Sequence, residues 1–303
     1  MSCAKLIIPI VLLVLSCSGA ERRTVSGRSW FSHHFIQREL EGDAWGQTAL
    51  CDIDRDGDLD FITGRRGGAV VWFEFREAGD WARHGIAELS PSDVGGVMLD
   101  VDRDGWADMV AGGSWFRNPA GSFDSLWVEH VFDPGLRSVH DIVAADLNGD
   151  GMAEIVTMAG EMQGVTRSET KDLRYYLIAE NPAGPWTKVK IGNFVHSGLA
   201  VADIDGDGDV DIVRSDIWLE NDGSGGGWEP HQIAGIEDWD HASQAAVADI
   251  DRDGRLDVVL AEGEISGARV AWFRCPADPV SQSWQACLLS AGDSTIRGPY
   301  HSL

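Results

Sequence analysis

The stretch DIDRDGDLD at residues 52–60 decides the fold, because it recurs along the chain at a nearly constant interval. Four related nonapeptides follow it: DVDRDGWAD (100–108), DLNGDGMAE (146–154), DIDGDGDVD (203–211) and DIDRDGRLD (249–257). Their first residues lie 48, 46, 57 and 46 positions apart. A period of this length is typical of repeat architectures, in which each unit is one supersecondary element.

The acidic character of the chain is concentrated in these five nonapeptides. They hold 21 acidic residues against four arginines, and so contribute −17 to the formal charge of −25 of the 303-residue chain. Because 44% of the residues are apolar, the chain has enough hydrophobic side chains for a core, and its charge does not indicate disorder. An acidic surface repels phosphate, which excludes nucleic acid as a partner.

The segments around each nonapeptide predict four β-strands per repeat. A short apolar stretch precedes the nonapeptide, as in QTALC (47–51), and a β-type run leaves it, as in LDFITG (59–64). A third run carries aromatic residues, as in AVVWFEF (69–75), and a fourth begins with Trp, as in WARHGIA (81–87). No segment has the period of a long amphipathic helix. We therefore expect an all-β fold, a β-propeller of four-stranded antiparallel blades.

The number of predicted strands does not fit five complete blades. Five sets of the first three strands are visible, but a sixth run of the fourth type, WFSHHFI (30–36), precedes the first acidic loop. The last residues, PYHSL (299–303), are similar to the stretch VHSGL (195–199) that leads into the fourth acidic loop. We interpret residues 21–303 as a propeller truncated from one of six or more blades.

Most tryptophans follow the repeat. Ten of the 13 fall in the third run or open the fourth, and at fixed repeat positions they are predicted to be packing residues. Trp45, Trp106 and Trp239 lie outside that pattern, so a surface role is expected for them.

Oxygen-donor side chains occupy positions 1, 3, 5 and 9 of every nonapeptide, and Gly at position 6 permits a sharp turn. Ca²⁺ takes about six to eight oxygen ligands, and a backbone carbonyl is expected from position 7. So many carboxylates in one turn repel each other unless a cation neutralises them, and five copies in register favour a metal site over a solvated acidic turn. We predict up to five Ca²⁺ sites, with the following ligands: Asp52, Asp54, Asp56, Asp60; Asp100, Asp102, Asp104, Asp108; Asp146, Asn148, Asp150, Glu154; Asp203, Asp205, Asp207, Asp211; Asp249, Asp251, Asp253, Asp257.

The loops are not chemically identical. The third is expected to be the weakest site, because it has the neutral Asn148 and the longer Glu154. The number of charged ligands disfavours Mg²⁺, and the lack of His or Cys in the loops disfavours Zn²⁺.

These loops make the chain resemble the FG-GAP/VCBS repeat family, and they are similar to the calcium loops of integrin α-subunit propellers. The resemblance covers about residues 44–290 and depends on the fivefold DxDxDG signal. Recognisable Phe-Gly and Gly-Ala-Pro elements are lacking, which places the chain nearer the bacterial VCBS-like members. The resemblance implies a calcium-bound propeller and leaves its ligand open.

Residues 1–20 are predicted to be a signal peptide, with Lys5 in front of the apolar stretch LIIPIVLLVL (6–15). VLSC ending at Cys17 resembles a lipoprotein signal, which would put a lipid anchor at Cys17, whereas Ser18 and Ala20 fit ordinary secretion, and both alternatives stay open. The mature chain is expected to be secreted, surface-bound or periplasmic, with no transmembrane span.

Three cysteines fall in the predicted mature domain. Cys275 and Cys287 flank a predicted hairpin and are candidates for a disulfide, which the sequence leaves undecided. Cys51 takes the place of the Ala residues that precede later acidic loops, which predicts a small core residue.

The end of the propeller opposite the acidic loops is the predicted ligand-binding face. Polar residues recur there before the first strand and after the second, and the candidates are His140, His196, His241, Arg65, Arg66 and Arg137. One hypothesis is a calcium-stabilised binding or interaction module with an extracellular protein or glycan ligand. The alternative is a carbohydrate-active enzyme such as a polysaccharide lyase, in which Arg would hold a carboxylate and His would remove a proton.

Overall fold

The computed structural model describes residues 32, 34–42, 45–92, 95–136, 139–159, 172–193, 198–233, 239, 243–262 and 268–290. The chain divides into a unit of residues 1–35 and a unit of residues 36–303, and all of the described strands lie in the second. The predicted signal segment, including Cys17, lies outside the described residues.

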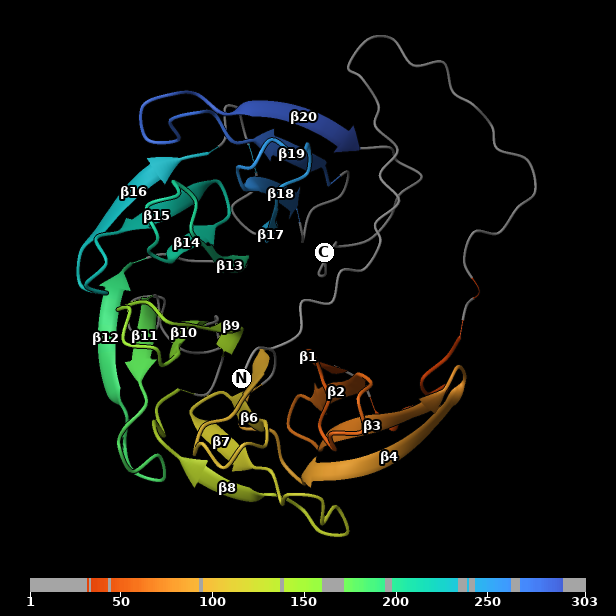
Figure 1. Ribbon diagram of the computed structural model, residues 1–303. Helices are drawn as coiled ribbons and strands as arrows, with labels where there is room; N and C mark the ends of the chain where they lie inside the picture. Colours follow the sequence, from red (N-terminus) through yellow and green to blue (C-terminus); the bar gives the residue numbers. More distant parts are fainter. Residues whose placement is uncertain are drawn as a thin grey trace. The chain divides into compact units, whose positions relative to one another are not determined.

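The second unit is a five-bladed β-propeller, and the prediction of an all-β fold is confirmed (Figure 1). Its described residues form twenty β-strands and no helix. No described segment is therefore a helix long and apolar enough to span a membrane.

Each blade is one four-stranded antiparallel sheet in which neighbouring strands are consecutive along the chain. Blade 1 consists of β1 (Trp45–Cys51), β2 (Asp60–Arg65), β3 (Val70–Glu77) and β4 (Asp80–Ala87). Blade 2 consists of β5 (Gly96–Leu99), β6 (Asp108–Ala111), β7 (Ser114–Arg117) and β8 (Val128–Val131). Blade 3 consists of β9 (Val139–Ala145), β10 (Glu154–Ala159), β11 (Leu173–Leu177) and β12 (Thr187–Gly192).

The last two blades have the same order. Blade 4 consists of β13 (Leu199–Ala202), β14 (Asp211–Arg214), β15 (Ile217–Asn221) and β16 (Trp228–Gln232). Blade 5 consists of β17 (Ser243–Ala248), β18 (Asp257–Glu262), β19 (Val270–Arg274) and β20 (Gln285–Ser290). The first strands lie nearest the axis, where β1 contacts β5, β5 contacts β9, β9 contacts β13 and β13 contacts β17 (Figure 1).

The core lies between blades. Four hydrophobic clusters each combine side chains of two consecutive blades, so that Trp72 of blade 1 shares a cluster with Phe116 of blade 2, and Trp218 of blade 4 shares one with Phe273 of blade 5. Burying such aromatic faces stabilises the stacking of one sheet on the next. Stacking of this kind explains why every blade repeats the same apolar pattern.

Three of the third-strand tryptophans are fully buried packing residues. Trp72, Trp115 and Trp218 are at most 1% exposed. Each stacks on a histidine of its own fourth strand, His84, His130 or His231, with ring centroids 4.4–4.6 Å apart. The expectation of a surface role for Trp239 is wrong, because this side chain is buried against Phe273 and Arg269.

Of the two candidate disulfide partners, Cys275 is a free thiol. Strand pairing places Cys287 opposite Trp272, whereas Cys275 follows Arg274, whose partner is Gln285. Cys275 is buried, and burial raises the pKa of its thiol to about 11. Cys51 packs partly buried against the cluster between blades 1 and 2, in line with its predicted role.

Candidate metal centre

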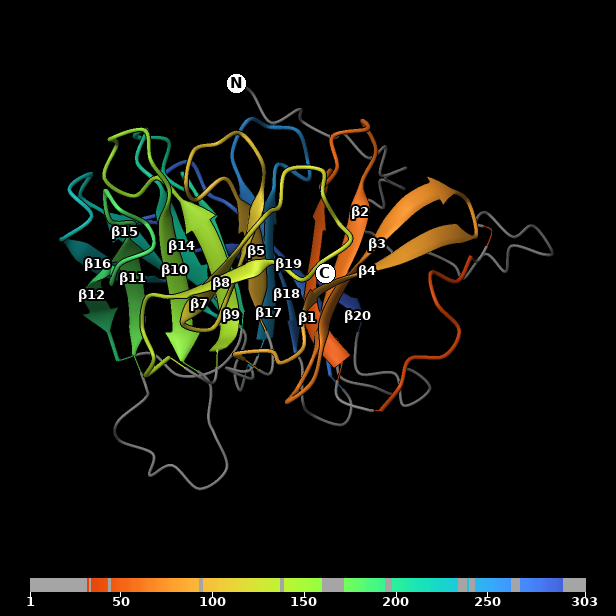
Figure 2. The same ribbon diagram turned by 90° about the horizontal axis from the view of Figure 1, so that it is seen from below.

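The five acidic loops each connect the first strand of a blade to the second. In every blade the residue before position 1 pairs with position 9, as Cys51 does with Asp60 and Ala248 does with Asp257. The loops are therefore hairpin turns of one kind, and they lie at the same end of the blades (Figure 2).

The backbone of each loop takes left-handed conformations at positions 4 and 6. Position 6 is always Gly, with φ between 86° and 104°. Position 4 has positive φ as well, in Arg55, Arg103 and Arg252 and in the glycines of the third and fourth loops. Glycine takes this conformation without steric cost, so its presence at position 6 has a direct conformational reason.

Two further side chains hold the turn from within. An Oδ1 atom at position 3 accepts the backbone N–H of position 5, and an Oδ1 atom at position 5 accepts the N–H of position 7, in all five loops. In the first loop these bonds are Asp56 N to Asp54 Oδ1 and Asp58 N to Asp56 Oδ1, both 3.1 Å. Such Asx turns leave the second carboxylate oxygen of each Asp available.

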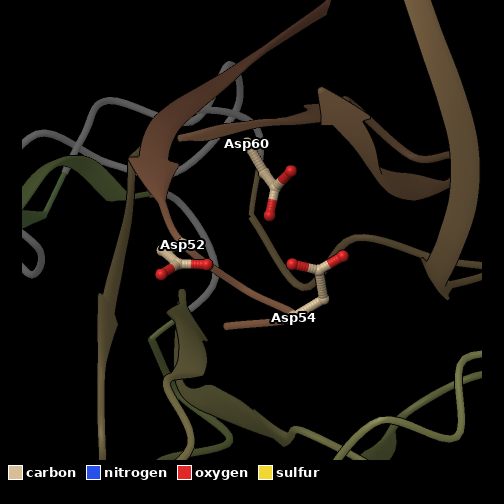
Figure 3. A group of neighbouring side chains, drawn as sticks. All are labelled: Asp52, Asp54 and Asp60. Carbon is tan, nitrogen blue, oxygen red and sulfur yellow. The ribbon is translucent and has the colours of Figure 1, made fainter. Parts of the chain in front are cut away.

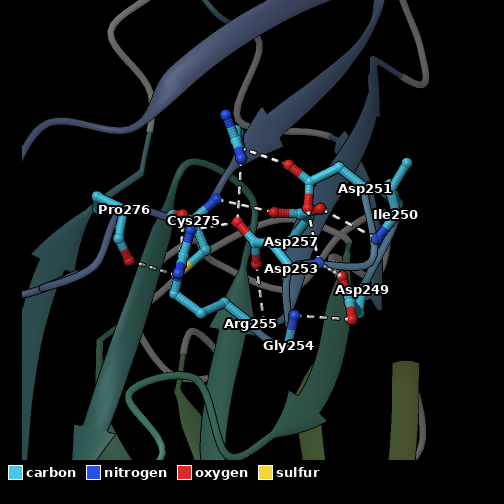
Figure 4. Close-up of polar contacts among 10 residues, drawn as sticks. Asp249, Ile250, Asp251, Asp253, Gly254, Arg255, Asp257, Cys275 and Pro276 are labelled. Atoms are coloured by element: carbon cyan, nitrogen blue, oxygen red, sulfur yellow. Dashed lines mark hydrogen bonds and ion pairs between the residues drawn. The ribbon is translucent and has the colours of Figure 1, made fainter. Parts of the chain in front are cut away.

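The carboxylate at position 9 is buried and ties the loop to the third strand. Asp108 accepts the N–H of Val101 at 3.0 Å and the N–H of Asn118 at 2.7 Å. Asp257 accepts the N–H of Ile250 at 3.0 Å and that of Cys275 at 2.9 Å (Figure 4). The pair of bonds also occurs at Asp60 and Asp211, so this side chain fixes the loop against the sheet.

Burial shifts the titration of these groups. It raises the pKa of Asp60 to about 6 and those of Asp108 and Asp211 to about 7, while backbone N–H donors act in the opposite direction. A carboxylate that is costly to ionise in its site gains from a nearby cation.

In four blades the side chains at positions 1, 3 and 9 converge. Each group offers three carboxylate oxygens within 4.8 Å of one another, and Figure 3 shows this arrangement in the first loop. The groups are Asp52, Asp54, Asp60; Asp100, Asp102, Asp108; Asp203, Asp205, Asp211; Asp249, Asp251, Asp257. The predicted ligands at position 5, Asp56, Asp104, Asp207 and Asp253, are not part of these groups.

The residues fit a hard divalent cation such as Ca²⁺. The donor set consists of oxygen atoms alone, which is the set that Ca²⁺ prefers. In the first loop Oδ1 of Asp52 is buried and has no hydrogen-bond partner, an arrangement that a bound cation would satisfy.

The third loop differs in its internal bonding. Nδ2 of Asn148 donates to Oε1 of Glu154 at 3.1 Å, and Glu154 also accepts the N–H of Leu147 at 2.8 Å. In the other four loops the equivalent oxygen of position 9 accepts a backbone N–H from the third strand instead. That the third loop is the weakest site stays a prediction.

Of the residues predicted to form a ligand-binding face opposite the acidic loops, the structure describes only some. Arg65 ends β2, and Arg66 follows it in an exposed turn. His196, His241, Arg137 and the side chain of His140 lie outside the described residues, so the lyase hypothesis stays a prediction.

Sequence reasoning missed the side chains of the third strand that surround the acidic loops. Arg117 contacts Asp102 and Asp104 in blade 2, and Arg274 contacts Asp251 and Asp253 in blade 5. Asn118 and Asn221 reach across to the loop of the preceding blade. An Arg or Asn immediately after the aromatic run was the available signal, as in SWFRN (114–118).

Comparison with solved structures identifies similar folds. A lectin from Agrocybe aegerita, described as recognising non-reducing terminal N-acetylglucosamine, has a TM-score of 0.53 and 18% identity over 80% of this chain and 66% of its own. The biofilm matrix protein Bap1 of V. cholerae has a TM-score of 0.47 and 16% identity, over 84% of this chain and 40% of its own. The rhamnogalacturonan lyase YesW has a TM-score of 0.40 and 14% identity, over 85% and 51%. The chain thus spans less than two thirds of each of these three proteins.

Among curated proteins, none matches the sequence. The FG-GAP-like repeat family matches twice, at residues 52–111 and 100–157, and both matches begin at the first Asp of an acidic loop. The later blades continue the same strand order and loop pattern. Residues 52–157 are therefore FG-GAP-like repeats, as the resemblance predicted, and they belong to one five-bladed propeller.

Proposed function

We propose that this chain is an extracellular, calcium-stabilised propeller that acts as a binding or interaction module. The observation that supports the proposal is the carboxylate group at positions 1, 3 and 9, repeated in four blades. Its oxygens lie close together in loops that connect the innermost two strands of each blade.

Calcium is the ion we propose because of the ligands and because of the loop. Carboxylate oxygens in a flexible turn suit its large coordination sphere, whereas Mg²⁺ requires a near-octahedral site and retains water. An ion in each loop would neutralise carboxylates that burial and mutual repulsion make costly to ionise. In this proposal the ions stabilise the propeller and hold the end opposite the acidic loops in a conformation that binds a ligand.

The predicted signal segment supports export from the cytoplasm, where calcium is scarce, to a compartment where such sites fill. We propose a secreted, periplasmic or surface location, with a lipid anchor at Cys17 as one form of attachment. The partner is proposed to be a surface protein or a glycan, bound at the end opposite the acidic loops.

Metal removal tests the calcium proposal. We expect about two or more Ca²⁺ per chain by elemental analysis after dialysis into calcium-free buffer, and a melting temperature that falls by at least about 10 °C in excess chelator and recovers with Ca²⁺ but not with Mg²⁺. Metal-free preparations that melt at the same temperature with and without calcium would contradict the proposal.

The binding role needs a separate measurement. We expect the purified protein to bind a restricted set of glycans or surface proteins on an array, in calcium and not in chelator. Glycans that end in N-acetylglucosamine belong on the array, because the lectin of similar fold is described as recognising that sugar. Uniform absence of binding, with calcium present and the protein folded, would leave only the structural role of the ion.

A further inference from the structure

One residue position beside the acidic loop differs in charge from blade to blade. In each blade the residue after position 9 pairs with a residue of the third strand, as Phe61 does with Phe73 and Met109 does with Phe116. The next third-strand residue lies beside the loop. Its occupants, from blade 1 to blade 5, are Glu74, Arg117, Leu177, Glu220 and Arg274.

In blades 2 and 5 this residue is an arginine that pairs with the loop. Nε of Arg117 lies 2.5 Å from Oδ2 of Asp102, and its Nη2 lies 3.0 Å from Oδ2 of Asp104. Arg274 repeats the geometry, with 2.5 Å to Oδ2 of Asp251 and 3.1 Å to Oδ2 of Asp253. The planar fork of a guanidinium suits two such oxygens at once.

These are the oxygens that the turn leaves available. Oδ1 of Asp102 accepts the N–H of Asp104, and Oδ1 of Asp104 accepts the N–H of Trp106. Oδ2 is therefore the atom that each of the two carboxylates can offer an ion, and in blade 2 Arg117 contacts both Oδ2 atoms. In blade 5 Arg255 adds a second guanidinium on Asp253.

In blades 1 and 4 the residue is a glutamate, which adds negative charge. Glu74 bonds His84 of the fourth strand at 2.8 Å and pairs with the exposed Arg76 at 3.2 Å, and Glu220 bonds His231 at 2.6 Å. Strand pairing places both glutamates beside the loop, at the position that Arg117 and Arg274 occupy in blades 2 and 5. In the described part of the chain, no basic side chain forms an ion pair with Asp54 or Asp205.

We infer that the acidic loops of blades 1, 2, 4 and 5 form two classes of cation site, set by this third-strand residue. The loops of blades 1 and 4 bind divalent cations tightly, because the third-strand residue beside them is a glutamate and not a guanidinium that competes for the ligand oxygens. The loops of blades 2 and 5 bind them weakly, because a cation must displace Arg117 or Arg274 from the same oxygens. This inference rests on the proposed calcium function and divides its sites.

Calcium titration of the metal-free protein by isothermal calorimetry tests the division of the loops into tight and weak sites. We expect a tight phase of two ions and a second phase at least tenfold weaker. Arg117→Gln and Arg274→Gln should each tighten one site of the second phase at least tenfold, because the competing charge is removed. Lys188→Gln is the matched control, since Lys188 is exposed to the same extent as Arg117, 49% against 48%, and pairs with Asp133 instead of a loop residue.

Terbium luminescence gives a local readout in blade 2. Trp106 occupies position 7 of that loop, so the emission lost on Trp106→Phe reports Tb³⁺ bound there. We expect this component to saturate only after the tight phase, and to move to at least tenfold lower Tb³⁺ in Arg117→Gln. The reverse change, Glu74→Arg, should remove one ion from the tight phase.

Failure of the inference and failure of the proposed function are distinguishable. A single affinity at all occupied loops, unchanged within twofold by Arg117→Gln and Arg274→Gln, overturns the two classes and leaves calcium binding intact. Absence of any bound ion, by calorimetry and by elemental analysis, overturns the proposed function and the inference with it.

Discussion

The structure of each acidic loop depends on the acidic residue at position 9. Asp108 and Asp211 are at most 1% exposed, and each accepts two backbone N–H groups, one from its own loop and one from the third strand. Burial nevertheless raises the pKa of both to about 7. The two N–H donors favour the charged form of these side chains, and a bound cation would favour it further.

The raised pKa values predict how the metal-free protein responds to pH. An Asp with a pKa of about 4 when unfolded and about 7 when folded binds more protons in the folded state between these values. Its contribution to the free energy of unfolding is full below about pH 4 and is lost as the pH rises to about 7. We expect the chelated protein to melt at higher temperature at pH 5 than at pH 7.5, and excess calcium to reverse the order. Asp211→Asn should reduce the slope in chelator, whereas an unchanged slope would contradict the assignment.

At the scale of elements, neighbouring blades are connected by asparagine side chains that end the third strand. Asn221 is 1% exposed, and its Nδ2 donates to the carbonyl of Leu147 in the blade 3 loop at 2.7 Å and to that of Val210 at 3.0 Å. Asn118 makes the same two kinds of bond between blades 2 and 1. These amides satisfy carbonyls of acidic loops, so the loops of consecutive blades are mechanically coupled.

We expect Asn221→Ala to lower the free energy of unfolding by about 2–3 kcal/mol, because it leaves two carbonyl groups near the loops without this donor. Denaturant unfolding in calcium measures the change. Asn193→Ala is the control, since Asn193 is exposed and accepts a bond from the exposed Lys190, and it should change the free energy by less than about 0.5 kcal/mol. Equal effects of the two substitutions would argue against coupling through Asn221.

The sequence predicts the strands and loops within one repeat better than it predicts the contacts between residues far apart in the chain. The five acidic loops, the strand order and the core tryptophans follow from spacing and alternation, which are properties of one repeat. The ion pair of Arg117 with Asp102 and the bond from Asn221 to Leu147 join residues 15 and 74 positions apart, and they depend on register and on blade stacking. Trp239 was misplaced for the same reason, because its burial depends on Phe273 of a neighbouring strand.

At the scale of the whole molecule, the propeller is a series of sheets in which each interior blade is covered on both sides. Second-strand residues show this clearly: Ile62, Val110, Val156 and Val213 are fully buried against the next blade. The equivalent Val259 of blade 5 is only partly buried, and so is Trp272, whose equivalents Trp72 and Trp218 are fully buried. On the other side of the series, Leu50 of blade 1 is 61% exposed.

Val213 and Val259 therefore give a matched pair, with the same side chain at the same place in consecutive blades. Stability of stacked repeats is the sum of terms within and between units, so a substitution acts through the interface it lies in. Val213→Ala leaves a cavity between blades 4 and 5 and should lower the free energy of unfolding by about 2 kcal/mol. Val259→Ala removes the same two methyl groups from a partly solvated face, and we expect less than half of that change in denaturant unfolding at saturating calcium. If the two substitutions lower the free energy of unfolding equally, the face of blade 5 that carries Val259 is as well covered in solution as the interior faces are. The blades would then close into a continuous ring of interfaces.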